Sequence, residues 1–218
     1  MKEKLHKALN KLGYTVILLL IFFLVKVLFR LEVSGRDNIP KTTDDLVITS
    51  THTSYWDPPL IGLIFGPRRQ IHFIARKGLL KNPLFSLPVK AYSTTINRDN
   101  FGKSDLIKML EAFRSDGLLC IFPEGTTKEG APPKSGTVRL AEKTNRKFLP
   151  VKIELDRSPL DPPFLFAPAR MTIGEPVGFE DLKQAVRQES GGGLSDEADS
   201  ELDYSELSLK LMERINQL

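Results

Sequence analysis

The sequence predicts an α/β fold with a mainly parallel, mixed sheet covered by helices on both faces, preceded by an N-terminal apolar helical segment. Two features of the chain predict it. Short apolar runs rich in β-branched residues, typical of buried strands, alternate with helical patterns after residue 45. Such alternation is typical of parallel sheets whose connecting helices cover both faces. The second feature is a long apolar run close to the amino terminus.

Composition limits both the architecture and the partners. The 218 residues suit one sizeable core, and the net charge of +4 combines bases that crowd before about residue 160 with acids that dominate residues 180–206. A basic body suits membrane lipids with anionic headgroups, phosphorylated substrates or acidic carrier proteins, and no aromatic-basic motif supports a nucleic-acid partner. The single Cys120 leaves no disulfide framework or CxxC metal site, so we expect a reducing compartment and no metal.

The apolar run near the amino terminus predicts membrane attachment. Residues 12–25 carry no charge, and the run reaches Phe29 only by passing Lys26. A spanning helix needs about 20 apolar residues, so a shallow or re-entrant anchor is favoured over a full span. A signal peptide and a buried core helix are the alternatives, but no small-residue cleavage site follows and the run is apolar on every face. We expect a peripheral or monotopic protein on the cytoplasmic face of the cell membrane.

The rest of the chain, residues 31–218, is expected to form one domain after a 1–30 anchor. Strands are expected at residues 31–35, 46–49, 71–75, 93–96, 118–122, 148–153 and 170–173. Helices are expected at residues 60–65, 104–115 and 137–144 and from about residue 204, with Ser104 as a cap. A glycine-rich linker at 191–193 within an acidic stretch precedes the last helix.

The stretch that follows the 46–49 strand looks built for chemistry. Because residues five apart on a helix diverge, His52 and Asp57 can meet only across an irregular turn, and Pro58 favours one by pushing Asp57 out of the α region. A neutral imidazole can take a proton from an alcohol, and a carboxylate on its other nitrogen fixes the tautomer. The alternative is that Asp57 only caps the helix beginning at Pro58 and that His52 is an ordinary loop residue.

Two further polar turns follow predicted strands in the same way. Arg98 comes after the 93–96 strand, and Glu124 comes after the 118–122 strand. In a parallel sheet the carboxyl ends of strands meet at one edge, so we expect His52, Arg98 and Glu124 to gather there.

With these turns in order, the sequence resembles the PlsC-like glycerolipid acyltransferase family, which includes 1-acyl-glycerol-3-phosphate acyltransferases. The resemblance spans roughly residues 30–175. It has four parts in the family's order, namely HTSYWD at 52–57 for the HxxxxD motif, INR at 96–98, FPEGT at 122–126 and LPV at 149–151. Four ordered motifs are far more specific than one.

The resemblance implies transfer of a fatty acyl group from acyl-ACP or acyl-CoA, with no cofactor, to the hydroxyl of lysophosphatidic acid. It implies that His52 is the general base, that Asp57 orients it and that Arg98 binds the acceptor's phosphate. It also assigns the turn at residues 124–126 (Glu124, Gly125 and Thr126) to acceptor binding. The alternatives are a surface ion pair of Arg98 with Asp99 or Asp105, and a satisfied turn residue at Glu124.

One departure from the family bears on the acceptor. Family members commonly have Arg after the EGT of the third motif, where this chain has Thr127. Either Lys128 or Lys134 supplies that charge, or the acceptor is another lysophospholipid or lipid hydroxyl. A noncatalytic, membrane-bound lipid-binding module is the remaining alternative, and the His52 and Asp57 pair argues against it.

Overall fold

The predicted mixed α/β sheet is confirmed. The computed structural model describes residues 2–127, 130–162, 165–189 and 203–218. In the described part of the chain, one seven-stranded sheet runs in the order β1-β7-β6-β2-β5-β3-β4. All neighbours are parallel except β6 and β7, which are antiparallel. The strands are β1 (Phe29–Ser34), β2 (Leu46–Ser50), β3 (Ile71–Arg76), β4 (Ser93–Ile96), β5 (Leu118–Ile121), β6 (Lys147–Leu155) and β7 (Ala167–Ile173).

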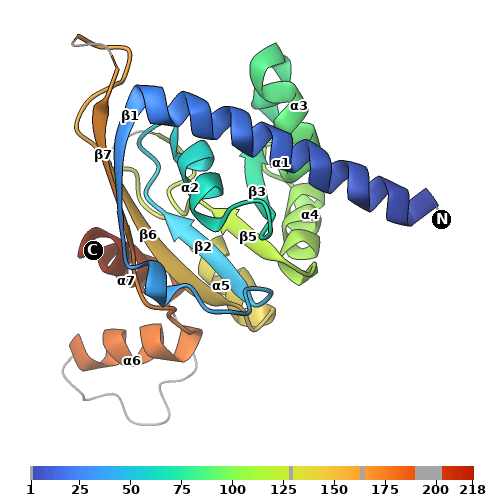
Figure 1. Cartoon of the computed structure of the whole chain (residues 1–218). Helices are drawn as coiled ribbons and strands as arrows, with labels where there is room; N and C mark the ends of the chain where they lie inside the picture. The colour runs from blue at the N-terminus through green and yellow to red at the C-terminus, as the bar shows by residue number, and fades with distance from the viewer. Residues whose placement is uncertain (1, 128–129, 163–164, 190–202) are drawn as a thin grey trace.

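Helices cover both faces of this sheet (Figure 1). Leu46 and Ile48 of β2 pack in the core beneath α1 and α2, while Val47 between them packs in the core beneath α4, α5 and α7. This alternation is the two-residue period of a strand buried on both faces. The helices are α1 (Lys2–Leu28), α2 (Asp57–Phe65), α3 (Pro83–Tyr92), α4 (Lys103–Arg114), α5 (Gly136–Lys143), α6 (Phe179–Glu189) and α7 (Tyr204–Asn216), with 3₁₀ turns η1 (Arg36–Asn38) and η2 (Lys77–Lys81).

The N-terminal apolar segment is a single helix that lies along the domain. Its residues Ala8–Leu28 are long and apolar enough to cross a membrane, judged by length and composition only. One stripe of α1 is buried, and the Tyr14 hydroxyl accepts a hydrogen bond of 3.1 Å from the Ile71 backbone N–H. The Tyr92 hydroxyl donates to the Asn10 carbonyl at 3.2 Å. Other apolar side chains of α1 are exposed, and they include Leu9, Leu12, Val16, Leu19, Leu20, Phe22, Phe23, Leu24 and Val27.

The structure corrects the expected course of the chain in three places. α3 is a helix despite Pro88 in its interior, and α6 is a helix within the stretch expected to be an acidic linker. The expected linker at residues 191–193 lies outside the described residues. Ser104 does not cap α4, because Gly102 is the N-cap and the Asp105 carboxylate accepts from the Gly102 N–H at 3.2 Å.

A buried arginine joins three elements at the edge of the sheet opposite the polar turns. The Arg146 guanidinium donates to the carbonyl oxygens of Leu46 at 3.1 Å and Gly117 at 3.0 Å, and also to that of Ser115. These carbonyls belong to the start of β2, the residue before β5 and the end of α4. Arg146 therefore fixes the amino ends of the central strands to the helix that covers them.

We expect Arg146→Met to lower the free energy of unfolding by about 3 kcal/mol, because buried carbonyl oxygens would lose their donor. Denaturant titration in mild detergent measures the change. Lys147→Met alters the exposed neighbouring residue and should change the free energy by less than about 0.5 kcal/mol. Equal losses in the two variants would contradict a structural role for the guanidinium.

Candidate active site

The turn between β2 and α2 is closed by one carboxylate oxygen. Oδ2 of Asp57 accepts hydrogen bonds of 2.9 Å from Nδ1 of His52, from the Thr53 backbone N–H and from the Ser54 backbone N–H. Asp57 is fully buried. The alternative that Asp57 only caps α2 is wrong, because the N-cap of α2 is Trp56 with no side-chain cap and the carboxylate instead bonds residues before the helix. The irregular turn that brings His52 and Asp57 together is confirmed.

The His52 ring is held by Asp57 at one nitrogen and by an aromatic face. Its ring stacks on Phe122 with centroids 4.1 Å apart and planes 20° from parallel. Because an ionised carboxylate can only accept, the proton on Nδ1 is the one donated to Asp57. Nε2 then keeps a lone pair, and the side chain is 14% exposed. The ring can therefore accept a proton at Nε2 from a group that reaches this edge.

Phe122 is a contributor that the sequence reasoning left without a role. It belongs to the third motif and comes directly after β5, so its place next to a strand end was the available signal. Its ring lies against His52 and excludes water from one face of the imidazole.

Glu124 links the third motif to the first. Its Oε2 accepts from the His52 backbone N–H at 3.3 Å, so the turns after β2 and β5 are joined through it. Burial raises the pKa of the Glu124 carboxyl, and the His52 N–H partly offsets this. Since the contact is to the main chain of His52, the reading of Glu124 as a satisfied turn residue fits the geometry.

Arg98 reaches the same turn from the other side of β3. Its Nη1 donates to the Gly125 carbonyl oxygen. The two acids considered for a surface ion pair are engaged elsewhere, since Asp99 pairs with Arg76 and Asp105 accepts from the backbone of Asn97 and Gly102. Burial, reinforced by the charge of Arg76, lowers the pKa of Arg98. A partly desolvated cation of this kind favours an anionic ligand.

The predicted substrate-binding residues divide between this turn and the undescribed part of the chain. Gly125 has a left-handed φ of 67°, and a Cβ there would lie 3.7 Å from Cε of Lys134 and 3.9 Å from Cζ of Arg98. Lys134 and Arg98 therefore flank Gly125, and half-buried Thr126 follows it. Lys128 lies outside the described residues. The expected meeting of the His52, Arg98 and Glu124 turns at one sheet edge is confirmed.

Several buried polar atoms in β2 and the turn after it have no hydrogen-bond partner among the described residues. They are Oδ1 of Asp57 and the hydroxyl oxygens of Thr49, Ser50 and Thr51. Buried polar atoms are usually satisfied by ordered water when protein groups do not reach them. The second oxygen of the Asp57 carboxylate is thus available to water.

His72 lies in β3 and makes its own hydrogen bond. Nε2 of His72 lies 2.8 Å from the Thr94 hydroxyl, and burial lowers the pKa of His72, which indicates a structural role. In the described part of the chain, no group of three or more His, Cys, Asp or Glu side chains is arranged to hold a metal ion.

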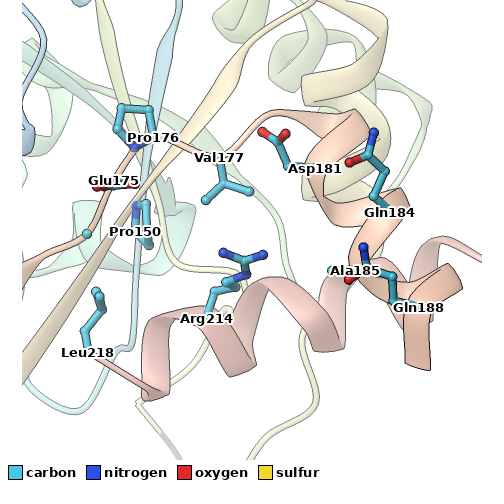
Figure 2. A pocket seen from close by; sticks show the side chains of 11 residues that line it. Pro150, Glu175, Pro176, Val177, Asp181, Gln184, Ala185, Gln188, Arg214 and Leu218 are labelled. Carbon is cyan, nitrogen blue, oxygen red and sulfur yellow. The ribbon is translucent and has the colours of Figure 1, made fainter.

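A cavity of about 520 Å³ lies away from His52, between α6, α7 and β6. Figure 2 shows Arg214 of α7 extending towards Val177, and Asp181 and Gln184 of α6 also line the cavity. Pro150 of the fourth motif lines it, but none of the predicted site residues does. Leu149 and Val151, the other two residues of that motif, are fully buried in the core.

The chain is similar to proteins of known activity. A model of the family described as Acyltransferase matches residues 30–154. The 1-acyl-sn-glycerol-3-phosphate acyltransferase of Bacillus subtilis (strain 168) is 28% identical over 162 residues, which cover 72% of this chain and 79% of that protein. The protein of the same name from Streptococcus pneumoniae (strain ATCC BAA-255 / R6) is 25% identical over 154 residues, covering 69% of this chain and 56% of its own length.

A solved structure has the same fold. It is the crystal structure of the 1-acyl-sn-glycerophosphate (LPA) acyltransferase, PlsC, from Thermotoga maritima, with a TM-score of 0.57 and 23% identity. The match covers 93% of this chain and 85% of that one.

We expect Gly125→Ala to destabilise the protein through its backbone. A methyl group would meet Lys134 and Arg98 only at ordinary contact distance, whereas a left-handed φ costs an L-residue about 1–2 kcal/mol. The Tm should fall by about 4 °C in a thermal melt. Gly136→Ala, where φ is not left-handed and no atom lies within 4 Å, should leave the Tm unchanged or raised, and an equal fall there would refute the backbone explanation.

Proposed function

The chain belongs to the acyltransferase family, and on that premise we propose that it moves a fatty acyl group from an acyl thioester to the free hydroxyl of 1-acyl-glycerol-3-phosphate, giving phosphatidic acid. The observation that carries the proposal is the contact of 2.9 Å between Nδ1 of His52 and Oδ2 of Asp57, on the same sheet edge as Arg98 and Lys134. The names of the curated relatives support the acceptor.

In the proposed reaction His52 is the general base and Asp57 orients it. The acceptor hydroxyl gives its proton to Nε2 of His52 while its oxygen attacks the thioester carbonyl carbon, and Asp57 stabilises the imidazolium through Nδ1–H. The tetrahedral intermediate collapses as the carbon–sulfur bond breaks. The thiolate leaves and takes up the proton, so the products are an ester and a free thiol. No redox step or cofactor is needed.

Arg98 and Lys134 are the proposed partners of the acceptor's phosphate. Arg98 is partly buried and Lys134 is exposed, and both flank Gly125. A guanidinium can bind a phosphate through two parallel hydrogen bonds. In this proposal Lys134 provides the charge that Thr127 does not, and Lys128 is a second candidate for it.

The proposed location is the cytoplasmic face of the cell membrane, with α1 as a monotopic anchor. The buried stripe of α1 ties it to the domain, and its exposed apolar side chains suit the boundary between headgroups and acyl chains. The acyl donor is acyl-ACP or acyl-CoA.

A second candidate acceptor is another lysophospholipid. The observation that favours it is Thr127, which stands where family members commonly carry Arg. The test incubates purified protein with labelled acyl-CoA or acyl-ACP and a panel of lysolipids, and identifies the products by mass spectrometry. Phosphatidic acid as the main product supports the proposal. A different main product would identify another acceptor. If detergent-dispersed assays yield no product, the proposed function is overturned.

We expect His52→Ala to lower kcat by about 10³-fold or more, because the hydroxyl would lose its base. Asp57→Asn should lower kcat by about 10²-fold or more, because an amide can donate to Nδ1 and select the wrong tautomer. Steady-state rates with matched thermal melts measure both. The control is His72→Gln, which should keep kcat within about twofold of wild type. Near wild-type kcat in folded His52→Ala protein would end the general-base proposal.

We expect Arg98→Ala to raise the KM for the acceptor by about tenfold or more, since a charge-assisted hydrogen bond contributes about 1.5–3 kcal/mol. The KM for the acyl donor should change less. Arg114→Ala, at the far end of α4, removes an exposed cation from the opposite sheet edge and should change neither. An unaltered acceptor KM in Arg98→Ala would rule out a phosphate contact.

A further inference from the structure

The connection between β6 and β7 exposes large apolar side chains. Leu160 is 66% exposed, Phe166 is 64% exposed and Leu165 is also exposed. Side chains of this size normally gain about 1.5–3 kcal/mol each when buried. In Figure 1 the described parts of this connection extend past the sheet beside the end of α1 that leads into β1.

The backbone of this loop is strained at two of its exposed apolar residues. Leu165 and Phe166 have φ values of 68° and 47°, which bulky residues rarely adopt. In the described part of the chain, the only other non-glycine residue with positive φ is Asn145, a type that tolerates it. Two consecutive outliers persist only where the surroundings determine them, and they indicate a functional constraint.

Two sets of hydrogen bonds hold that conformation. The Arg157 guanidinium donates to the carbonyl oxygens of Ser158 at 3.3 Å, Asp161 at 3.2 Å and Leu165 at 2.8 Å. The Phe166 backbone N–H donates to the Val27 carbonyl oxygen of α1 at 3.3 Å. The loop is therefore tied to the last turn of α1, where Phe23, Leu24 and Val27 are also exposed.

Topology places this loop on the same sheet edge as the candidate active site. β6 is parallel to its neighbour β2, so the chain leaves β6 at the edge where it leaves β2 for His52. β7 is antiparallel to β6, so it begins at that edge. β1 is parallel to β7 and therefore begins there as well, next to the end of α1. Exposed Lys26 and Arg30 stand at the junction of α1 and β1, where cations suit anionic headgroups.

We propose that the β6–β7 loop is a second membrane-binding element, which inserts Leu160, Leu165 and Phe166 into the leaflet that receives the outer face of α1. A helix lying in the interface can roll about its own axis, and a second contact beside its end prevents this. The sheet edge that carries His52 then faces the bilayer, where a lysolipid presents its hydroxyl. The inference rests on the membrane attachment in the proposed function.

The test compares the full chain with Leu160→Ser/Phe166→Asn. Asn tolerates the left-handed backbone at residue 166, so the loop should keep its shape without its apolar side chain. Partition onto vesicles of phosphatidylcholine and phosphatidylglycerol should weaken about tenfold or more, and activity on vesicle-embedded acceptor should fall while activity on detergent-dispersed acceptor holds. The control Leu209→Asn removes a leucine that is 56% exposed from α7, on the other face of the sheet, and should match wild type.

Partition within twofold of wild type would overturn the loop proposal. A changed oligomeric state with unchanged partition would do so as well, and would assign the surface to contact between copies. If the wild-type protein shows no activity on dispersed acceptor, the proposed function is refuted, whereas the partition result still tests the loop proposal.

A second measurement labels Phe166→Cys with an environment-sensitive fluorophore, which reacts selectively because native Cys120 is buried. The fluorescence should show a blue shift on vesicles. No shift would contradict insertion.

Discussion

A single oxygen atom, Oδ2 of Asp57, governs the local structure on which the proposed chemistry depends. It accepts three N–H groups, two from the turn backbone and one from the His52 ring. Charge-assisted bonds inside a buried site are stronger than in water, and each would leave a costly unpaired donor if it were lost. The same atom therefore shapes the turn before α2 and selects the histidine tautomer.

The sheet brings this turn to the same edge as the other polar turns. Parallel strands β2, β5, β3 and β4 deliver their following turns to one edge, and cross-links between the turns hold them there. Glu124 bonds the His52 backbone, and Arg98 bonds the Gly125 carbonyl. A cation and a base that come from distant parts of the sequence thus share one edge of the sheet.

The fold class and the three turns could be predicted because strand periodicity and proline placement are local signals. The pairing of His52 with Asp57 was predicted as well, but the hydrogen bonds between different turns could not be. The contact of Arg98 with the Gly125 carbonyl depends on a path across β3 that no spacing encodes. α3 was missed because Pro83 and Pro88 indicate a loop, although Tyr92 packs its end against Tyr14 of α1. α6 was missed because it buries only Leu182 and because the acidic residues around it indicated a linker.

We infer that Asp57 holds His52 with its proton on Nδ1 and its lone pair on Nε2. Nitrogen-15 NMR of histidine-labelled protein tests this most directly, because the two ring nitrogens have different shifts when protonated and when not. With His52 assigned by comparison with His52→Ala, the neutral ring should show protonated Nδ1 and unprotonated Nε2. A neutral ring protonated at Nε2 would contradict the account, since that nitrogen could not then accept the acceptor's proton.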